Sequence, residues 1–162
     1  MIFVVLGTQK FQCNRLLEQI DELISQGIIR DKVFAQKGNS DYEPKNYEYV
    51  DFVEKQQFEE LIEQCDLLVT HSGVGTILSG KNHGRPVIVF PRLKKYGEHV
   101  DDHQLDIARA FGKKNLVFMC GENDNLGELI EKARDHSFDK YVSQRTKMIQ
   151  IIEDYIKEEK NV

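Results

Sequence analysis

The segment DLLVTHSGVGTI, residues 66–77, decides the fold. It begins with an apolar run, which is typical of a strand buried on both faces of a sheet. Two glycines follow, and residues 74–81 then predict a helix that ends at Gly84. A buried strand joined to a helix through a short glycine turn is the repeating unit of parallel α/β sheets.

The same alternation extends along the chain in both directions. Apolar runs predict strands at residues 2–6, 33–35, 49–52, 66–70, 87–90 and 116–119. Helical spacing of apolar residues predicts helices at 16–24, 58–65, 74–81 and 102–111. We therefore expect an α/β fold: a Rossmann-like, mostly parallel sheet with helices on both faces. The domain should span residues 1–136, and residues 137–162 should add an amphipathic C-terminal helix.

Composition narrows the class of protein. The 162 residues carry a net charge of −5, which disfavours a nucleic-acid binder that neutralises phosphates. The apolar runs are too short for a membrane span or a signal peptide, so we expect a cytoplasmic location. Cys13, Cys65 and Cys120 are odd in number and far apart. They predict core thiols, with a catalytic thiolate as the alternative.

Ligands of parallel α/β sheets bind beyond the carboxyl ends of the strands. After the strand at 66–70, glycines would let a ligand approach the backbone, and the helix-start amides would attract phosphate. Ser72 and Thr76 add hydroxyl donors. The spacing fits neither a dinucleotide fingerprint nor a Walker motif, and a plain tight turn is the alternative. Gly7, Thr8 and Gln9 could form a second, smaller phosphate-facing turn.

The segment PRLKKYGEHVDDHQ, residues 91–104, gathers many polar groups after another predicted strand. Its basic residues could meet a pyrophosphate, and its carboxylates, imidazole and amide could bond sugar hydroxyls. Glu98 or His99 could act as a general base. His99 and His103 could share a metal, although no third ligand is evident. Alternatively, Asp101 or Asp102 simply caps the following helix.

The C-terminal residues 138–160 carry an interrupted apolar stripe. Its members are Tyr141, Val142, Met148, Ile149, Ile152, Tyr155 and Ile156, with Lys147, Glu153, Asp154 and Lys157 off it. The helix could pack on its own sheet, dock a protein partner or lie on a membrane. Glu158 and Glu159 offset its basic residues, which favours a protein partner over lipid.

Taken together, DLLVTHSGVGTI, GRPVIVFPR and EHVDDHQ resemble the C-terminal, nucleotide-sugar-binding domain of the family-28 glycosyltransferases. The resemblance covers nearly the whole chain and implies one half of the two-halved GT-B architecture. It is similar to the small catalytic subunits of two-component transferases of the dolichol-pathway kind. PRLKKYGEHVDDHQ looks most like the bacterial capsule and exopolysaccharide subunits of that type.

The resemblance implies a UDP-sugar donor and no cofactor or metal. The family's glycine turn would hold the nucleotide, the first loop would face the diphosphate, and a polar pair would touch the donor sugar. Where many members carry an acidic residue for the ribose, this chain has Ser79. The predicted catalytic residues are Glu98 and His99. The predicted donor-binding residues are Gly7, Thr8, His71, Ser72, Gly73, Gly75, Thr76, Arg92, Asp102, His103 and Gln104.

The resemblance also implies partners. A membrane-anchored subunit would supply the other GT-B half and a lipid-diphosphate-linked sugar acceptor, recruiting this chain to the inner face of the membrane. The reaction would be inverting transfer of galactose, glucose, glucuronic acid or GlcNAc in capsule or exopolysaccharide synthesis. The C-terminal helix would be a dock for the partner, and the free subunit could self-associate. The alternatives are a non-catalytic enhancer or nucleotide-sugar-binding module, a UDP-GlcNAc epimerase and a dinucleotide enzyme.

Overall fold

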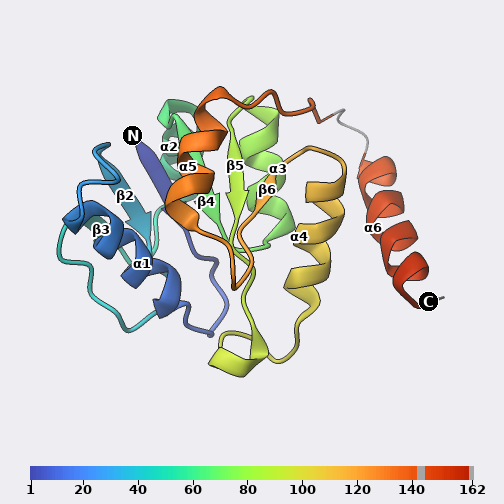
Figure 1. Cartoon of the computed structure of the whole chain (residues 1–162), viewed down its shortest axis with the longest axis horizontal. Helices are drawn as coiled ribbons and strands as arrows, with labels where there is room; N and C mark the ends of the chain where they lie inside the picture. The colour runs from blue at the N-terminus through green and yellow to red at the C-terminus, as the bar shows by residue number, and fades with distance from the viewer. Residues whose placement is uncertain (142–144, 161–162) are drawn as a thin grey trace.

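The six predicted strands form one parallel sheet in the computed structural model, in the order β3-β2-β1-β4-β5-β6 (Figure 1). The structure describes residues 1–141 and 145–160, with the backbone alone at 145–149 and 158–160. The predicted Rossmann-like sheet is thereby confirmed. The strands are β1 (Ile2–Val5), β2 (Val33–Gln36), β3 (Glu48–Val50), β4 (Leu67–Thr70), β5 (Val87–Val89) and β6 (Phe118–Met119).

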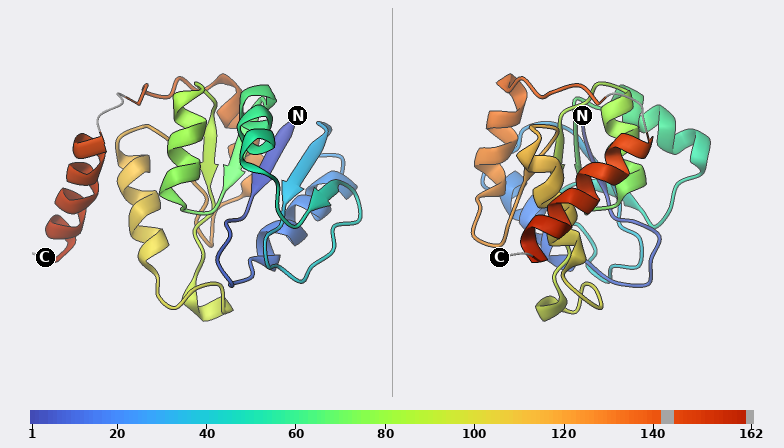
Figure 2. Two further views of the ribbon diagram at one scale, coloured as in Figure 1. Left: turned by 180° about the vertical axis from the view of Figure 1, so that it is seen from behind. Right: turned by 90° about the vertical axis from the view of Figure 1, so that its right-hand side faces the viewer.

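Helices cover both faces of the sheet, as predicted (Figures 1 and 2). They are α1 (Asn14–Ser25), α2 (Lys55–Gln64), α3 (Val74–Asn82), the 3₁₀ turn η1 (Lys94–Tyr96), α4 (His103–Lys113), α5 (Leu126–Asp135) and α6 (Arg145–Lys160). Alternate residues of a strand point to opposite faces. On β1, Ile2 and Val4 therefore pack with α1 and α5, whereas Phe3 and Val5 pack with α2, α3 and α4.

Helix α5 was absent from the sequence prediction. Its signal is a capping pattern at its start: the Asn125 side chain accepts a hydrogen bond from the Glu128 amide at 3.1 Å. Leu126, Ile130 and Ala133 then follow at helical spacing and are buried against α1. The cap and the apolar period together mark a helix that the predicted pattern left as a loop.

The C-terminal segment packs back on its own domain where the structure describes it. Helix α6 lies beside α4 at the end of the molecule (Figure 1), and Ile151 and Ile152 join the core cluster on that face. Val142 and the side chains of Met148 and Ile149, which belong to the predicted stripe, lie outside the described residues, as does the side chain of Lys147, which was predicted to lie off it. Among the helices that the structure describes, we find none with the length and apolar character needed to cross a membrane.

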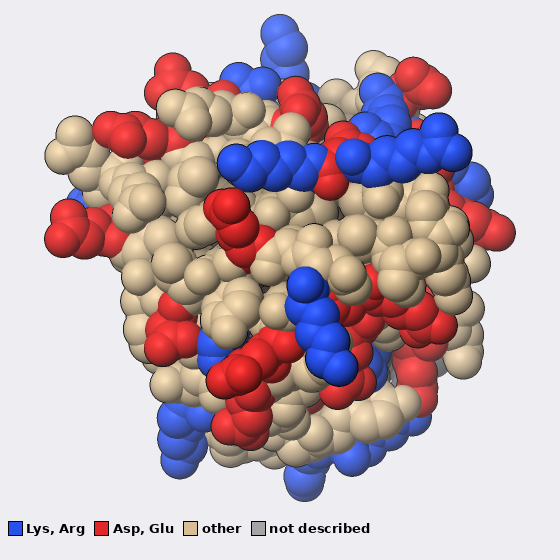
Figure 3. Space-filling model, turned by 90° about the vertical axis from the view of Figure 1, so that its left-hand side faces the viewer, with Lys and Arg blue, Asp and Glu red and all other residues tan. Residues whose placement is uncertain are grey.

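The negative net charge is not gathered into one area on the side of the molecule seen in Figure 3. Acidic and basic side chains are interspersed there with uncharged ones. This face therefore offers no continuous positive surface for electrostatic capture of a polyanion.

All strands run the same way, so their carboxyl ends meet at one edge of the sheet, the lower edge in Figure 1. β1 pairs with its neighbours β2 and β4, and Val5 lies opposite Gln36 of β2 and Thr70 of β4. Gly38 has a φ of 59°, and a Cβ atom there would lie 2.6 Å from the Gly7 carbonyl oxygen. The loops after β1 and β2 are thus brought into close contact.

Candidate functional site

The loops after β1 and β4 meet around the imidazole of His71. A Cβ atom at Gly7 would lie 2.5 Å from His71 Nε2, and one at Gly73 would lie 2.7 Å from His71 Cε1. Only glycine leaves room for the ring at both positions. His71 itself is buried, so its ring fixes the spacing of the two glycine loops from within.

The two glycines of the turn after β4 should respond differently to substitution. Gly73→Ala should destabilise the protein by about 1–3 kcal/mol, because the new methyl group would press into the His71 ring. Gly75→Ala should be neutral or stabilise by up to about 1 kcal/mol, because a Cβ atom there meets no atom within 4 Å and favours the helix. Urea unfolding of both variants measures the difference. Equal stabilities would contradict the packing around His71.

Gln104, at the start of α4, joins the loops after β4 and β5. Its Oε1 accepts hydrogen bonds from the backbone amides of Ser72 (3.3 Å) and Arg92 (3.0 Å). Its Nε2 lies 3.3 Å from His71 Nδ1. The resemblance predicted that Gln104 touches the donor sugar, but the structure places this buried amide in a bridge between loops.

Burial and the nearby guanidinium of Arg92 lower the pKa of His71 to about 3. The imidazole is therefore neutral at physiological pH. A neutral ring can rest beside Arg92 without adding a second positive charge. His71 is one of the predicted donor-binding residues. Its ring is buried and keeps the two glycine loops apart from within.

Acid should weaken the fold through His71. Below pH 6.5, the ordinary histidine pKa, the unfolded chain takes up a proton that the folded chain does not. The free energy of unfolding should then fall by up to about 1.4 kcal/mol per pH unit as the pH drops toward 3. Urea unfolding at pH 6.5 and pH 5 should show a larger loss for the wild type than for His71→Gln. Equal losses would mean that His71 titrates normally.

The start of α3 offers hydrogen-bond donors that the protein leaves unused. The N-cap residue is Gly73, which has no side chain to cap this helix, and the amides of a first turn have no partner within the helix. The Ser72 hydroxyl is buried and makes no hydrogen bond in the structure. Gly75 is exposed and Thr76 is half-buried beside it. Gly75 and Thr76 therefore form the accessible donor surface at the positive end of the helix dipole, whereas the amides of Ser72 and Gly73 donate to Gln104 Oε1 and to the His71 carbonyl oxygen.

A buried positive charge lies close by. Arg92 is fully buried, and its guanidinium nitrogens make no hydrogen bond in the structure. Among the described residues, only Ser72, Arg85 and Arg92 have buried side-chain atoms without a partner, and two of the three are at this edge. Burial lowers the pKa of Arg92, but an arginine remains charged. An unpaired buried cation is costly, so this edge favours an anion.

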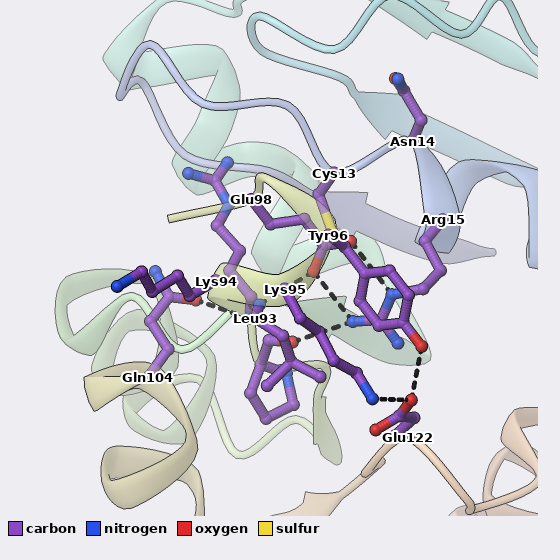
Figure 4. Close-up of polar contacts among 12 residues, drawn as sticks. Cys13, Asn14, Arg15, Leu93, Lys94, Lys95, Tyr96, Glu98, Gln104 and Glu122 are labelled. Carbon is purple, nitrogen blue, oxygen red and sulfur yellow. Dashed lines mark hydrogen bonds and ion pairs between the residues drawn. The ribbon is translucent and has the colours of Figure 1, made fainter. Parts of the chain in front are cut away.

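Glu98, predicted as a candidate base, has another position. It is 1% exposed, and Arg15 donates to both of its carboxylate oxygens, at 3.0 Å from Nε and 2.9 Å from Nη2 (Figure 4). The Leu93 amide donates a third hydrogen bond, at 2.9 Å. A carboxylate saturated in this way holds the loop together and is poorly placed to receive a substrate proton. Sequence reasoning missed Arg15, because nothing in a regular helix pattern marks it.

His99 is better placed for proton transfer. Its Nδ1 lies 3.2 Å from Asp101 Oδ1, and its ring packs 5.2 Å from the Phe11 ring, centroid to centroid. The His103 amide donates to the same Asp101 carboxylate at 3.0 Å and lowers the pKa of Asp101. Asp101 thus stays ionised and can orient the imidazole through Nδ1, leaving Nε2 to exchange a proton.

The remaining predicted residues lie at the rim of this edge. His103 is 76% exposed, with its ring 3.6 Å and 3.7 Å from carboxylates of Asp101 and Asp106. Asp102 accepts a hydrogen bond from the Lys94 amide at 2.9 Å, and Thr8 is exposed. No group of three or more metal-binding side chains gathers within the described part of the chain, so the structure adds no third ligand to His99 and His103.

Two further sequence expectations concern residues outside the turn. Ser79 donates to Glu59 of α2 at 3.1 Å, so a carboxylate does lie beside this position, supplied by a neighbouring helix. The three cysteines are free and buried, and burial raises their pKa, to about 11 for Cys65 and about 12 for the others, Cys13 and Cys120. Protonated thiols of this kind support packing and not catalysis.

Comparisons with known proteins bear on this geometry. Residues 1–158 match the model of the glycosyltransferase family 28 C-terminal domain. Human UDP-N-acetylglucosamine transferase subunit ALG13 is 26% identical over 128 residues, which cover 74% of this chain but only 11% of the human protein. A solution structure of ALG13 has a TM-score of 0.59 at 19% identity, covering 93% of this chain and 94% of that one. Glycosyltransferase SnogD from Streptomyces nogalater has a TM-score of 0.57 at 20% identity, covering 96% and 39%.

Proposed function

Since this chain belongs to the glycosyltransferase family 28 C-terminal domain family and has the fold of a single GT-B half, we propose that it is the UDP-sugar-binding, catalytic subunit of a two-component inverting glycosyltransferase. The observation that carries this proposal is the start of α3. There, the buried Ser72 hydroxyl has no hydrogen-bond partner among the described residues, and the N-cap residue Gly73 has no side chain to satisfy the first-turn amides.

A nucleotide diphosphate suits these groups. Phosphate oxygens accept hydrogen bonds from helix-start amides and hydroxyls, and the helix dipole favours their charge. Gly73 and Gly75 allow the phosphates to approach the backbone closely. Gly7 and Thr8 lie on the adjacent loop and complete the cradle in this proposal.

Local charge favours the same ligand. Arg92 brings an unpaired buried positive charge to this edge, whereas the charge of Arg15 is matched by its pair with the buried Glu98. The described cluster therefore carries an excess of one positive charge beside a neutral His71. During transfer, negative charge grows on the departing UDP, and fixed donors and cations stabilise it without reorganisation.

We assign the general base to His99. In an inverting displacement, the acceptor hydroxyl attacks the anomeric carbon from the face opposite the leaving UDP. The bond from that carbon to the diphosphate oxygen breaks as the new glycosidic bond forms. His99 Nε2 takes the hydroxyl proton, while Asp101 holds Nδ1 and stabilises the imidazolium. His103 and Asp102, at the exposed rim, would bond hydroxyl groups of the donor sugar.

The proposed partner is a membrane-anchored subunit that presents a lipid-diphosphate-linked sugar and recruits this chain from the cytoplasm to the inner face of the membrane. The word "subunit" in the name of the human relative supports a two-component arrangement. That name also supports a UDP-sugar donor, and we propose a hexose. The resemblance of residues 91–104 to bacterial capsule subunits supports a place in capsule or exopolysaccharide synthesis.

A second candidate function is a nucleotide-sugar-binding module whose partner does the chemistry. The burial of Glu98 favours this second function, because it removes one of the two predicted bases and leaves only His99 on this chain. Both functions require donor binding, and only the first requires His99 for transfer.

Calorimetric titration of the purified chain with UDP, a panel of UDP-sugars and NADH tests the proposal. We expect saturable binding of UDP and of one preferred UDP-sugar, with no binding of NADH. If the chain alone fails to bind, the titration is repeated with the chain co-expressed with its membrane subunit. Failure of both preparations would contradict the proposed function.

A further inference from the structure

Arg15 connects the first turn of α1 to the long loop after β5. Its guanidinium donates two hydrogen bonds to Glu98 and one to the Pro91 carbonyl oxygen, at 3.2 Å (Figure 4). The guanidinium carbon also lies 4.3 Å from the ring centroid of Phe90 and 4.7 Å from that of Tyr96. A planar cation that lies against two aromatic rings and pairs with a carboxylate through two of its nitrogens has little freedom to move.

The segment that Arg15 holds, residues 93–98, is called the strap here. Its only regular structure is the single turn η1, so side chains must fix its path. Gln12 Nε2 donates to the Tyr96 carbonyl oxygen at 2.9 Å from the α1 side. On the other side, Glu122 binds both Lys95 and the Tyr96 hydroxyl. Figure 4 shows the contacts of Glu122 on one side of the strap and the Arg15–Glu98 pair at its C-terminal end.

The Arg15–Glu98 pair differs from the other anchors because it is withdrawn from water. Glu98 is 1% exposed and the Arg15 side chain 19% exposed, whereas the side chains of Lys95 and Glu122 are 56% and 36% exposed. Bidentate arginine–carboxylate pairs have fixed geometry, and removal of one partner leaves the other buried and unpaired. The Arg15–Glu98 pair is therefore the firmest of the contacts that hold the strap in position.

His99, the assigned base, is the residue directly after Glu98. We propose that Arg15 is a positioning residue for the transfer reaction: through Glu98 it fixes the strap, and thereby holds the His99 imidazole beside Phe11 and Asp101. This inference rests on the proposed function. Arg15 makes no contact with the start of α3, where the donor phosphates are placed. Its loss should consequently affect the rate of transfer more than the affinity for the donor.

The test uses the chain co-purified with its membrane subunit. Arg15→Met should lower kcat by about 100-fold, as expected for a catalytic group displaced by about 1 Å, and change the donor KM by less than about threefold. Arg15→Lys keeps the charge but loses the two-pronged pairing, so it should recover part of the lost rate and serve as a variant that folds.

Arg134 provides a matched control. It forms a bidentate pair with Asp31, at 2.7 and 3.0 Å, and Asp31 precedes β2 at the opposite edge of the sheet. Arg134→Met should lower the melting temperature but leave kcat unchanged. A kcat loss in Arg134→Met equal to that in Arg15→Met would show a general effect of stability and overturn the inference. A rise in donor KM that accounts for the whole effect of Arg15→Met would make Arg15 a donor contact and would also overturn it.

Amide hydrogen exchange of the chain alone gives a readout that does not depend on activity. Arg15→Met should accelerate exchange of the strap amides, including that of Leu93, by at least about tenfold, while Arg134→Met should not. If the wild type binds no UDP, either alone or with its membrane subunit, the proposed function fails whatever the exchange shows. If it binds UDP but Arg15→Met changes neither strap exchange nor kcat, the positioning inference is wrong.

Discussion

Replacing Gly75 with Asp should abolish UDP binding and leave the protein folded. A Cβ atom at Gly75 meets no other atom within 4 Å, so the larger side chain fits. A carboxylate in the first turn of α3 also favours the helix, because it lies at the positive end of the dipole. That carboxylate would occupy the position of the diphosphate and repel its negative charge. We expect UDP affinity to fall by about 100-fold or more, as measured by calorimetry.

Gly75→Asn is the matched control for this experiment. Asn has nearly the shape of Asp but carries no charge, so its affinity for UDP should fall far less. Thermal unfolding of both variants should give melting temperatures at or above that of the wild type. Undiminished UDP binding by Gly75→Asp would place the nucleotide away from the start of α3.

The second large effect is expected at His99. His99→Ala should lower the rate of sugar transfer by about 10²–10⁴-fold, which is the usual contribution of a general base. The affinity for UDP should stay within a few-fold of the wild type, because the phosphate donors on α3 are untouched. The measurement is transfer by the chain together with its membrane subunit, beside calorimetry of the chain.

His136→Ala controls for the loss of a packed imidazole. The ring of His136 lies 4.6 Å from that of Phe118, and its Nε2 lies 2.6 Å from Asn115 Oδ1, so its loss removes comparable contacts away from the strap. Transfer by this variant should match the wild type. Normal transfer by His99→Ala would favour the second function, in which the partner supplies the base. Loss of UDP binding would make His99 a donor contact.

Sequence pattern predicted the sheet because its strands are short, apolar and buried on both faces. The residues that form β1, β4 and β5 are buried without exception, and each was expected within one residue of its observed ends. Prediction was poorer at the sheet edges. The strand expected at 116–119 pairs only through Phe118 and Met119, because β6 has a neighbour on one side only.

The glycine turn after β4 was predictable for a different reason. Its chemistry is local: two glycines and two hydroxyl residues follow a strand and open a helix, and all four lie together in the structure. The loop after β5 was predicted as a group of polar residues, but their individual positions were not. Glu98 is paired with Arg15, 83 residues away in the chain, and only the folded sheet brings these two together. A sequence pattern read over a short stretch of the chain cannot predict a pairing between residues so far apart.

Nuclear magnetic resonance titration of the ¹⁵N-labelled chain with UDP tests most directly whether the nucleotide binds at the start of α3. We expect the largest changes in amide chemical shift on residues 72–76, with further changes in the loops after β1 and β5. Saturable shifts confined to another edge of the sheet would contradict binding at this site.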